Sequence, residues 1–195
     1  MSPAEVEALP RLQSIRRTAA QERIIAAALE LFAQHGVSGT SLQMIADEIG
    51  VSKAAVYHQY PTKNEIVLAV AESEFAKLEA AVEAAEAQHS RQRARQMLLT
   101  QVITMAVERR PWVRALQNDP IMVRLLAEHA PLRDVMDRIY GLLIDDAGPR
   151  ARVRIAIMGA TIGATVVHPL VADLDDDTLR EELLRVARRL FDISL

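Results

Sequence analysis

The chain has 195 residues, half of them apolar and a quarter charged, which is ordinary globular composition and enough for one or two domains. The absence of cysteine excludes disulfide bonds and thiolate metal sites and fits a reducing cytosol. A net charge of −3 argues against a nucleic-acid binder that is basic throughout, so any DNA-binding surface has to be local. Sparse glycine and proline predict an all-α chain, and the N-terminal residues lack the pattern of a secretory signal peptide.

Residues 1–17 show no strong hydrophobic periodicity, and we predict a flexible basic arm. Its arginines, Arg16 and Arg17 among them, can lie along DNA phosphates or enter a minor groove. The alternative is a disordered tail without a role, which is the favoured state in free solution.

The first helix is predicted from about Ala19 to His35. Thr18 and Gln21 have the spacing of a capping box at its start, and Gly36 suits its end. With the two helices that follow, it would complete a three-helix DNA-binding domain over residues 18–61.

Two short helices separated by a glycine turn are predicted next. Thr40 and Gln43 have capping-box spacing, which predicts a helix over Ser41 to Ile49. Ser52 is a good N-cap for a second helix over Lys53 to Gln59. Two short helices joined by a tight turn form a helix-turn-helix.

The residues that carry this motif stand at fixed spacing. They are Ile45-Ala46, Gly50-Val51-Ser52-Lys53, Val56-Tyr57-His58 and Tyr60-Pro61-Thr62-Lys63. Together they closely resemble the DNA-binding signature of the TetR family of bacterial repressors. Ala54, Gln59 and Tyr60 differ from residues that are frequent in the family, which leaves the operator sequence open. Without the resemblance, the second helix could be a connector whose polar face meets water.

The polar and aromatic side chains around the motif are the types that reach phosphates and base edges. The candidate DNA-binding residues are Arg16, Arg17, Thr40, Ser41, Gln43, Ser52, Lys53, Ala54, Tyr57, His58, Tyr60 and Lys63. Gln43 and Lys53 are the best candidates for base edges, and Lys63 for a phosphate at a helix N-terminus. The resemblance implies that Tyr57 combines a buried ring with a hydroxyl on phosphate. His58 could be an ordinary surface histidine.

Residues 62–195 are predicted to form a larger helical domain for effector binding and dimerisation. Its expected helices run from about Thr62 to Ala87, Arg91 to Arg109, Asp119 to Glu128 and Pro131 to Asp145, with a short piece after Pro111. The uncharged run Ile155 to Ala172 has the length of a membrane span, but its threonines, histidine and proline favour a buried helix. Thr178 and Glu181 predict the cap of a final helix with an apolar seam.

Effector candidates are drawn from residues 97–158, where methionines are frequent, because methionine adapts to irregular apolar ligands. They are Met97, Gln101, Met105, Trp112, Met122, His129, Met136, Tyr140 and Met158. For any single residue, an ordinary place in the core is the more frequent outcome. The family resemblance implies a mostly apolar pocket in this region.

Dimer candidates lie in the last two helices. They are Gly159, Gly163, Val166, Leu183, Val186 and Leu190. The glycines are four residues apart, which allows close approach of a second helix, and two copies would form a four-helix interface about a two-fold axis. Alternatively, the seam packs within its own chain.

The resemblance implies a homodimeric, ligand-responsive repressor that binds a palindromic double-stranded DNA operator and is released by a small, mostly apolar effector. We expect it in the bacterial cytoplasm, associated with the nucleoid when bound and with no membrane partner. An activator of the same fold is an alternative. Another is a helical small-molecule-binding or enzymatic protein in which the helix-turn-helix is only structural.

We expect no enzyme activity and no cofactor. The five histidines are scattered, and the sequence has no HExxH, glycine-rich phosphate loop or GxSxG motif. The acidic cluster at Asp173, Asp175 and Asp177 begins like a calcium loop, but Thr178 and Leu184 stand where that loop needs glycine and glutamate. No metal site is therefore predicted.

Overall fold

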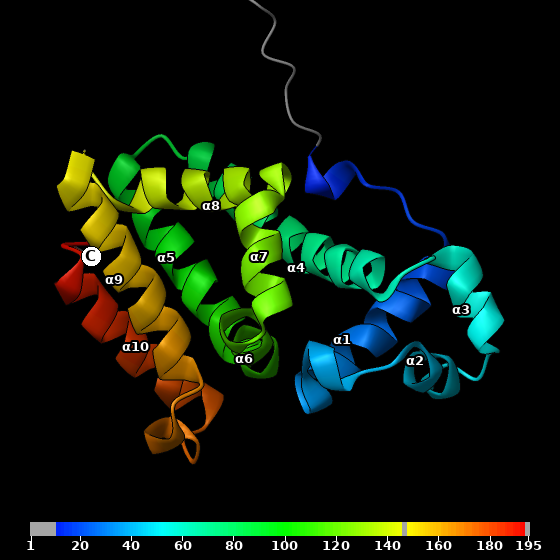
Figure 1. The fold of residues 1–195 in the computed structure, drawn as a ribbon. Coiled ribbons are helices and arrows are strands. Elements are labelled where there is room, and N and C mark those ends of the chain that lie inside the picture. Colours follow the sequence, from blue (N-terminus) through cyan, green and yellow to red (C-terminus); the bar gives the residue numbers. More distant parts are fainter. Residues whose placement is uncertain (1–10, 146–147, 194–195) are drawn as a thin grey trace, which may run out of the picture.

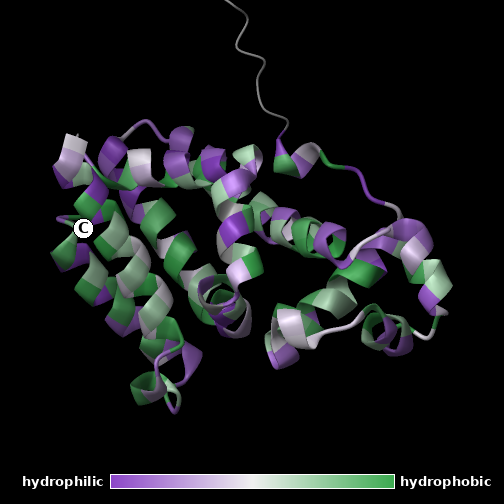
Figure 2. Cartoon of the chain, viewed as in Figure 1, coloured by the Kyte–Doolittle hydropathy of each residue, from purple (hydrophilic) through white to green (hydrophobic). Residues whose placement is uncertain are grey.

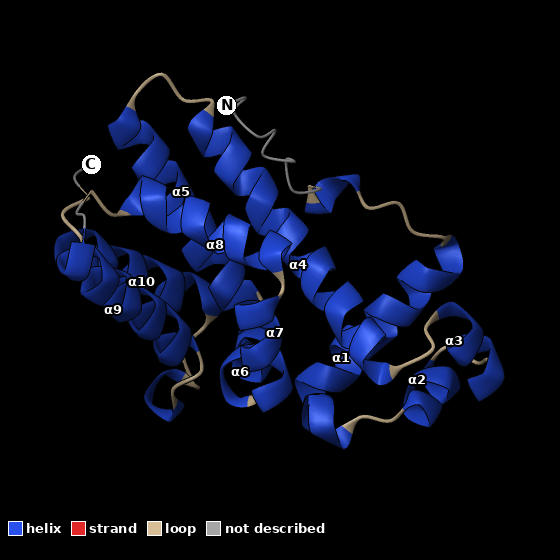
Figure 3. Ribbon diagram, turned by 45° about the horizontal axis from the view of Figure 1, so that its top comes forward, coloured by secondary structure: helices blue, strands red, loops and turns tan. Residues whose placement is uncertain are grey.

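The structure, a computed structural model, describes residues 11–145 and 148–193. Within those ranges every regular element is a helix (Figure 3), as the composition predicts. In chain order the elements are η1 (Leu12–Ser14), α1 (Ala19–Gly39), α2 (Leu42–Glu48), α3 (Lys53–Gln59), α4 (Lys63–Glu86), α5 (Arg91–Glu108), α6 (Arg110–Asn118), α7 (Pro120–Glu128), α8 (Ala130–Leu143), α9 (Gly148–Val166), η2 (Pro169–Val171) and α10 (Asp176–Leu190). None of these helices is long and apolar enough to cross a bilayer.

Side-chain caps fix several helix starts at the residues that the sequence indicates. Thr18 and Gln21 form the reciprocal capping box of α1. Ser52 and Thr62 accept the backbone N–H three residues ahead at the starts of α3 and α4. Asp119 caps α7. Each cap satisfies a backbone donor that the helix itself leaves unpaired.

Two predicted caps are wrong. The cap of α2 is Ser41, whose hydroxyl accepts the Met44 N–H at 3.2 Å, because the Thr40 hydroxyl turns inward and donates to backbone carbonyls. The cap of α10 is Asp175, which accepts the Thr178 N–H at 2.9 Å. This hydrogen bond lowers the pKa of Asp175, since it favours the charged carboxylate.

The end of α1 also differs from the prediction. Gly36 has a φ of +73°, so it kinks the chain as a helix-ending glycine does, but helical turns resume and continue to Gly39. The last helical turn before α2 is therefore offset from the main axis of α1.

Helices α1 to α3 lie at one end of the molecule and α9 and α10 at the other, with α4 running between them (Figure 1). Helix α4 packs against α1, η1, α5 and α8. Buried apolar side chains form one continuous cluster from Leu12 to Ile193. The core thus runs through the whole described chain and connects its two ends.

Part of the predicted flexible arm is docked on α4. Leu12 is buried, and the Gln13 backbone N–H donates to Glu79 Oε2 at 3.0 Å. The Arg17 guanidinium forms an ion pair with Glu72 at 3.0 Å. Residues 11–17 therefore contact α4, with Leu12 in an apolar site and Arg17 on a carboxylate, and the flexibility of the arm stays a prediction; residues 1–10 lie outside the described residues.

Candidate DNA-binding surface and ligand cavity

Helix α3 presents a bare polar face to solvent. Of its residues only Val56 is buried, and Tyr57 is 49% exposed. Within the described chain, the side chains of Lys53, Tyr57 and His58 form no hydrogen bond or ion pair, and Ala54 beside them is exposed. Small and unpaired side chains on a helix of this kind allow close approach to a groove wall.

Four further predicted contacts remain on the surface. Arg16 is exposed, and Ser41 and Ser52 are exposed caps of α2 and α3. The Gln43 amide donates to Asp47 Oδ1 at 2.7 Å within α2. Gln43 would have to break that hydrogen bond to read a base.

Three of the predicted DNA contacts are instead buried in the fold. Thr40 is 2% exposed, and its hydroxyl donates to the Gly36 carbonyl at 2.8 Å. Tyr60 is buried, and that burial raises the pKa of its hydroxyl. The Arg17 side chain is 9% exposed and is paired with Glu72 at 3.0 Å, so all three residues have places within the fold.

Lys63 is half-buried, and its Nζ donates to the carbonyls of Val37 at 3.0 Å and Thr40 at 3.1 Å. The ammonium therefore joins the start of α4 to the segment between α1 and α2, where the sequence predicted a phosphate contact. Arg23, which was not singled out from the sequence, also stabilises the backbone of this region. Its guanidinium donates to the Ile49 carbonyl at 2.9 Å, at the turn after α2.

A mostly apolar cavity of about 400 Å³ lies between α4, α5, α6, α8 and α9. That volume falls within the range of small-molecule sites in proteins. Five of the nine effector candidates line it: Met105, Trp112, Met136, Tyr140 and Met158. The methionine-rich region thus supplies much of the cavity wall.

The other four effector candidates lie elsewhere. Met122 is fully buried in the core, and Met97 packs against the core from a half-buried position. Gln101 is exposed. His129 precedes α8, and its Nε2 is 3.3 Å from Glu72. An ordinary place in the core was the alternative to effector binding for each of these residues, and the two methionines have such places.

The polar residues of the cavity wall were missed from the sequence, apart from Tyr140. Glu74 is a buried carboxylate 2.5 Å from Lys77 Nζ and 3.7 Å from the Arg109 Nε. The wall contributed by α6 and the residue before it consists of Arg109, Trp112, Val113, Leu116 and Gln117. Spacings of three and four residues put these five on one helical face. A polar residue at each end of such an apolar face is a signal that could have identified them.

Helix α6 also contacts the DNA-binding end of the molecule, since it packs against α1. At its end, Asp119 Oδ2 accepts hydrogen bonds from the Ser38 backbone N–H at 3.2 Å and hydroxyl at 3.4 Å. Asp119 Oδ1 accepts the Ile121 N–H at 2.9 Å. A single buried carboxylate therefore ties the α6–α7 junction to the segment that precedes α2.

The outward sides of α9 and α10 carry apolar residues. Val153, Ile157, Val186 and Leu190 are 44–59% exposed. Ala156, Ala160 and Ala164 of α9 are also exposed. Hydrophobic residues predominate in α9 beyond its first turns (Figure 2). We call these seven residues the apolar strip.

Only two of the six dimer candidates, Val186 and Leu190, belong to the apolar strip. Val166 and Leu183 are buried, and Gly159 and Gly163 line the cavity. Those four face the interior of the described chain, and the dimer interface itself stays a prediction. Both sides of α9 carry small residues, and the alanine side is the one that faces outward.

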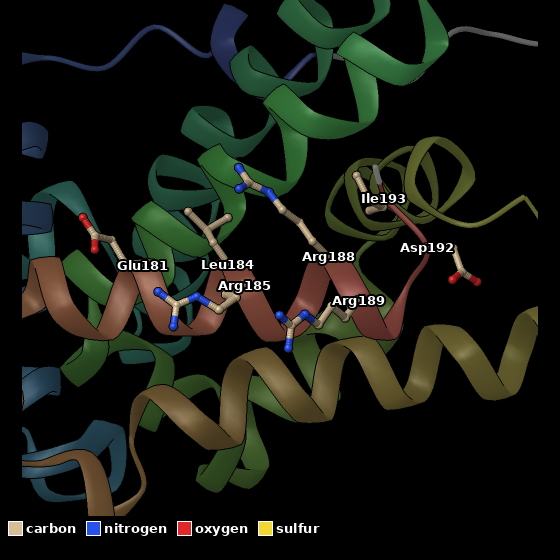
Figure 4. Close-up of a pocket in the computed structure, with 7 residues that line it drawn as sticks. All are labelled: Glu181, Leu184, Arg185, Arg188, Arg189, Asp192 and Ile193. Atoms are coloured by element: carbon tan, nitrogen blue, oxygen red, sulfur yellow. The ribbon is translucent and has the colours of Figure 1, made fainter. Parts of the chain in front are cut away.

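A second hollow, of about 640 Å³, runs along the end of α10 and is lined by Glu181, Leu184, Arg185, Arg188, Arg189, Asp192 and Ile193. Its charged side chains spread along the helix rather than converging on one point (Figure 4). It lacks the apolar enclosure of the ligand cavity. Among the described residues, no group of three or more histidine or acidic side chains is arranged to hold a metal ion.

Residues 24–70 match the family model described as bacterial regulatory proteins, tetR family. This part of the chain is a TetR family DNA-binding region. The matched stretch contains all of α2 and α3 and the start of α4. All eight curated relatives are named as HTH-type transcriptional regulators, in agreement with the prediction that the chain is not an enzyme.

Similarity to these relatives is confined to one part of the chain. SrpR from Pseudomonas putida is 45% identical over 60 residues, which cover 28% of each chain. The chain spans only 17–28% of the length of three such relatives.

Solved structures extend the likeness to the whole fold. PfmR from Thermus thermophilus, a TetR family regulator, has a TM-score of 0.64 at 20% identity, covering 87% of this chain and 97% of that one. FadR from Bacillus subtilis, solved in complex with stearoyl-CoA, has a TM-score of 0.65 at 15% identity, covering 85% and 96%. The N-terminal helix-turn-helix and the C-terminal helical domain of this chain are thus those of a TetR family fold.

Proposed function

We propose that this TetR family chain is a homodimeric transcriptional repressor that a small, mostly apolar effector releases from a palindromic operator. The observation that carries the proposal is the exposed face of α3, where Lys53, Tyr57 and His58 have no partner in the described chain. Side chains of these types on a recognition helix contact phosphates and base edges in a major groove. Such a protein works in the cytoplasm and associates with the nucleoid when bound.

The apolar strip supports dimerisation. Exposed Val153, Ile157, Val186 and Leu190 are large apolar side chains that a second copy would remove from water. A two-fold axis through this strip would relate the two α3 helices, one from each copy. Two recognition helices then read half-sites about one helical turn, or a multiple of it, apart.

The cavity of about 400 Å³ supports an effector. FadR from Bacillus subtilis, which shares the fold, was solved with stearoyl-CoA, a molecule with a long apolar chain. An effector in the cavity would press on α6, which packs against α1 and is tied to Ser38 through Asp119. Binding would thereby favour one orientation of the DNA-binding helices over another.

The test is a gel-shift titration at stated salt, with fragments of the region upstream of the gene that encodes the chain. A Lys53→Ala, Tyr57→Ala double variant should lose sequence-preferring binding. Arg93→Ala is the matched control, because Arg93 is an exposed cation on α5 without a side-chain partner in the described chain.

Equal and sequence-independent binding by wild type and the double variant would refute the repressor. A reporter gene placed behind a bound fragment gives the sign of regulation: repression is expected, and activation would contradict it.

A further inference from the structure

On the side of α9 that faces the cavity, two glycines one turn apart, Gly159 and Gly163, lie beside Met158 and Ile162. A Cβ on Gly163 would overlap the Gln117 Nε2 and lie 3.0 Å from its Cδ. A Cβ on Gly159 would lie 3.3 Å from the Tyr140 hydroxyl. The missing side chains of α9 therefore make room for the polar ends of residues from α6 and α8.

Neither polar end has a partner of its own. In the described part of the chain, the Gln117 amide and the Tyr140 hydroxyl take part in no hydrogen bond, although both residues line the cavity. A ligand that displaces water from this wall must replace those hydrogen bonds or leave the groups unsatisfied, which is unfavourable. The wall thus favours ligands that have a hydrogen-bonding group at this place.

The charged residues of the cavity lie elsewhere. Gln117 is eight residues beyond Arg109, about 12 Å along a helix. Glu74 beside Arg109 is already paired with Lys77. Burial, and then the carboxylate of Asp137, raise the pKa of the Tyr140 hydroxyl. Asp137 would repel a carboxylate of the ligand, and because Asp137 is exposed to solvent its attraction for a cation is weak.

We propose that Gln117 and Tyr140, seated against Gly159 and Gly163, bind an uncharged hydrogen-bonding head group such as an alcohol, carbonyl or amide. The apolar remainder of the effector would occupy the space beside Phe75 and Met105. This inference rests on the proposed function, which assigns the cavity to an effector, and it defines the chemical class of that effector.

The single tryptophan of the chain, Trp112, lines the cavity and provides an intrinsic signal for its occupation. We would titrate the protein, without DNA, with decan-1-ol, decanoate and decyltrimethylammonium, following the fluorescence of Trp112. The alcohol is kept below its aqueous solubility and the two ions below their critical micelle concentrations. These probes share one tail and differ in the charge of the head group. Decan-1-ol should bind at least about tenfold more tightly than either ion, because only the alcohol forms hydrogen bonds with the Gln117 amide and the Tyr140 hydroxyl without adding a charge.

Three variants test the residues. Tyr140→Phe removes only the hydroxyl and should weaken decan-1-ol binding about 2- to 10-fold, the effect of one neutral hydrogen bond. Gly163→Ala should weaken it as well, because the added Cβ displaces the end of Gln117, while alanine in a helix raises the thermal midpoint. Gly141→Ala in α8 is the matched control: its Cβ would meet nothing within 4 Å, so it should stabilise the protein without changing binding.

Each opposite outcome overturns the inference. One is tighter binding of decanoate that Arg109→Gln abolishes, and another is tighter binding of the cation that Glu74→Gln abolishes. Wild-type affinity in Gly163→Ala and Tyr140→Phe would exclude the polar wall, and no binding of any probe would exclude this ligand class. The gel shift separates these failures from the proposed function: if decan-1-ol binds as expected but leaves DNA binding unchanged, head-group recognition stands and effector-released repression fails.

Discussion

Replacing Lys63 with methionine separates the structural role of this residue from a role in DNA binding. Methionine keeps the aliphatic length of the side chain and removes the ammonium that donates to the Val37 and Thr40 carbonyls at 3.0 and 3.1 Å. Hydrogen bonds from a charged donor contribute about 1.5–3 kcal/mol each when buried. Since this site is half-buried and water can reach the freed carbonyls, we expect a combined loss of about 2 kcal/mol.

The loss is measured by urea unfolding and by the thermal midpoint. For a chain of this size, about 2 kcal/mol corresponds to a drop of about 4–8 °C. DNA binding is measured in parallel as the dependence of affinity on salt concentration, which needs only a non-specific duplex. Lys63→Met should leave the salt slope unchanged, because the ammonium is already engaged by the protein.

Lys53→Met is the matched control, because Lys53 is exposed on α3 and has no partner in the described chain. It should leave stability within about 0.5 kcal/mol of wild type, as surface changes usually do. It should flatten the salt slope by about 0.9, because one phosphate is no longer neutralised. The opposite pattern for Lys63→Met would be an unchanged free energy of unfolding and a smaller salt slope of DNA affinity. It would show that Lys63 leaves its carbonyl partners to bind phosphate, and it would refute this reasoning.

Three further changes test other parts of the structure. Changing Val186 and Leu190 to glutamate should give a monomer in sedimentation equilibrium, and a persistent dimer would place the interface off the apolar strip. Asp119→Ala should cost about 1–3 kcal/mol in urea unfolding, because it removes a helix cap and the acceptor of the Ser38 N–H; an unchanged midpoint would mean that water replaces both. Leu12→Ala should cost about 2–5 kcal/mol and speed proteolysis near residue 11, whereas unaltered cleavage would contradict the docking of η1.

Local chemistry decided which helix starts could be predicted. Thr18, Ser52 and Thr62 each stand alone as the best cap at their position, Asp119 is favoured by Pro120 at the first helical position, and the structure uses all four. At Thr40 the next residue is also a good cap, and the choice depends on carbonyls from α1 that accept the threonine hydroxyl. Such a tertiary partner cannot be read from spacing alone.

The orientation of α9 was not predictable for a similar reason. Its glycines and its alanines both form smooth sides, and hydropathy does not say which side meets the rest of the chain. The outcome depends on tertiary contacts with Gln117 of α6 and Tyr140 of α8, whose polar ends occupy the space that glycine leaves. The cavity was partly predictable, since composition pointed to the methionines but not to Glu74 or Arg109.

The contacts of α6 limit how strongly an effector could act in the proposed repressor. The hydrogen bonds between Asp119 and Ser38 are one connection between cavity and DNA-binding helices, and a buried connection of this kind is worth about 1–3 kcal/mol. That range corresponds to about a 5- to 150-fold change in DNA affinity. A full reversal of the populations of the DNA-binding and released conformations, from 1:99 to 99:1, needs about 5.5 kcal/mol. One such connection is therefore insufficient for a complete switch. In a dimer both copies contribute, since both recognition helices must match their half-sites at once, so two modest couplings can approach the required value.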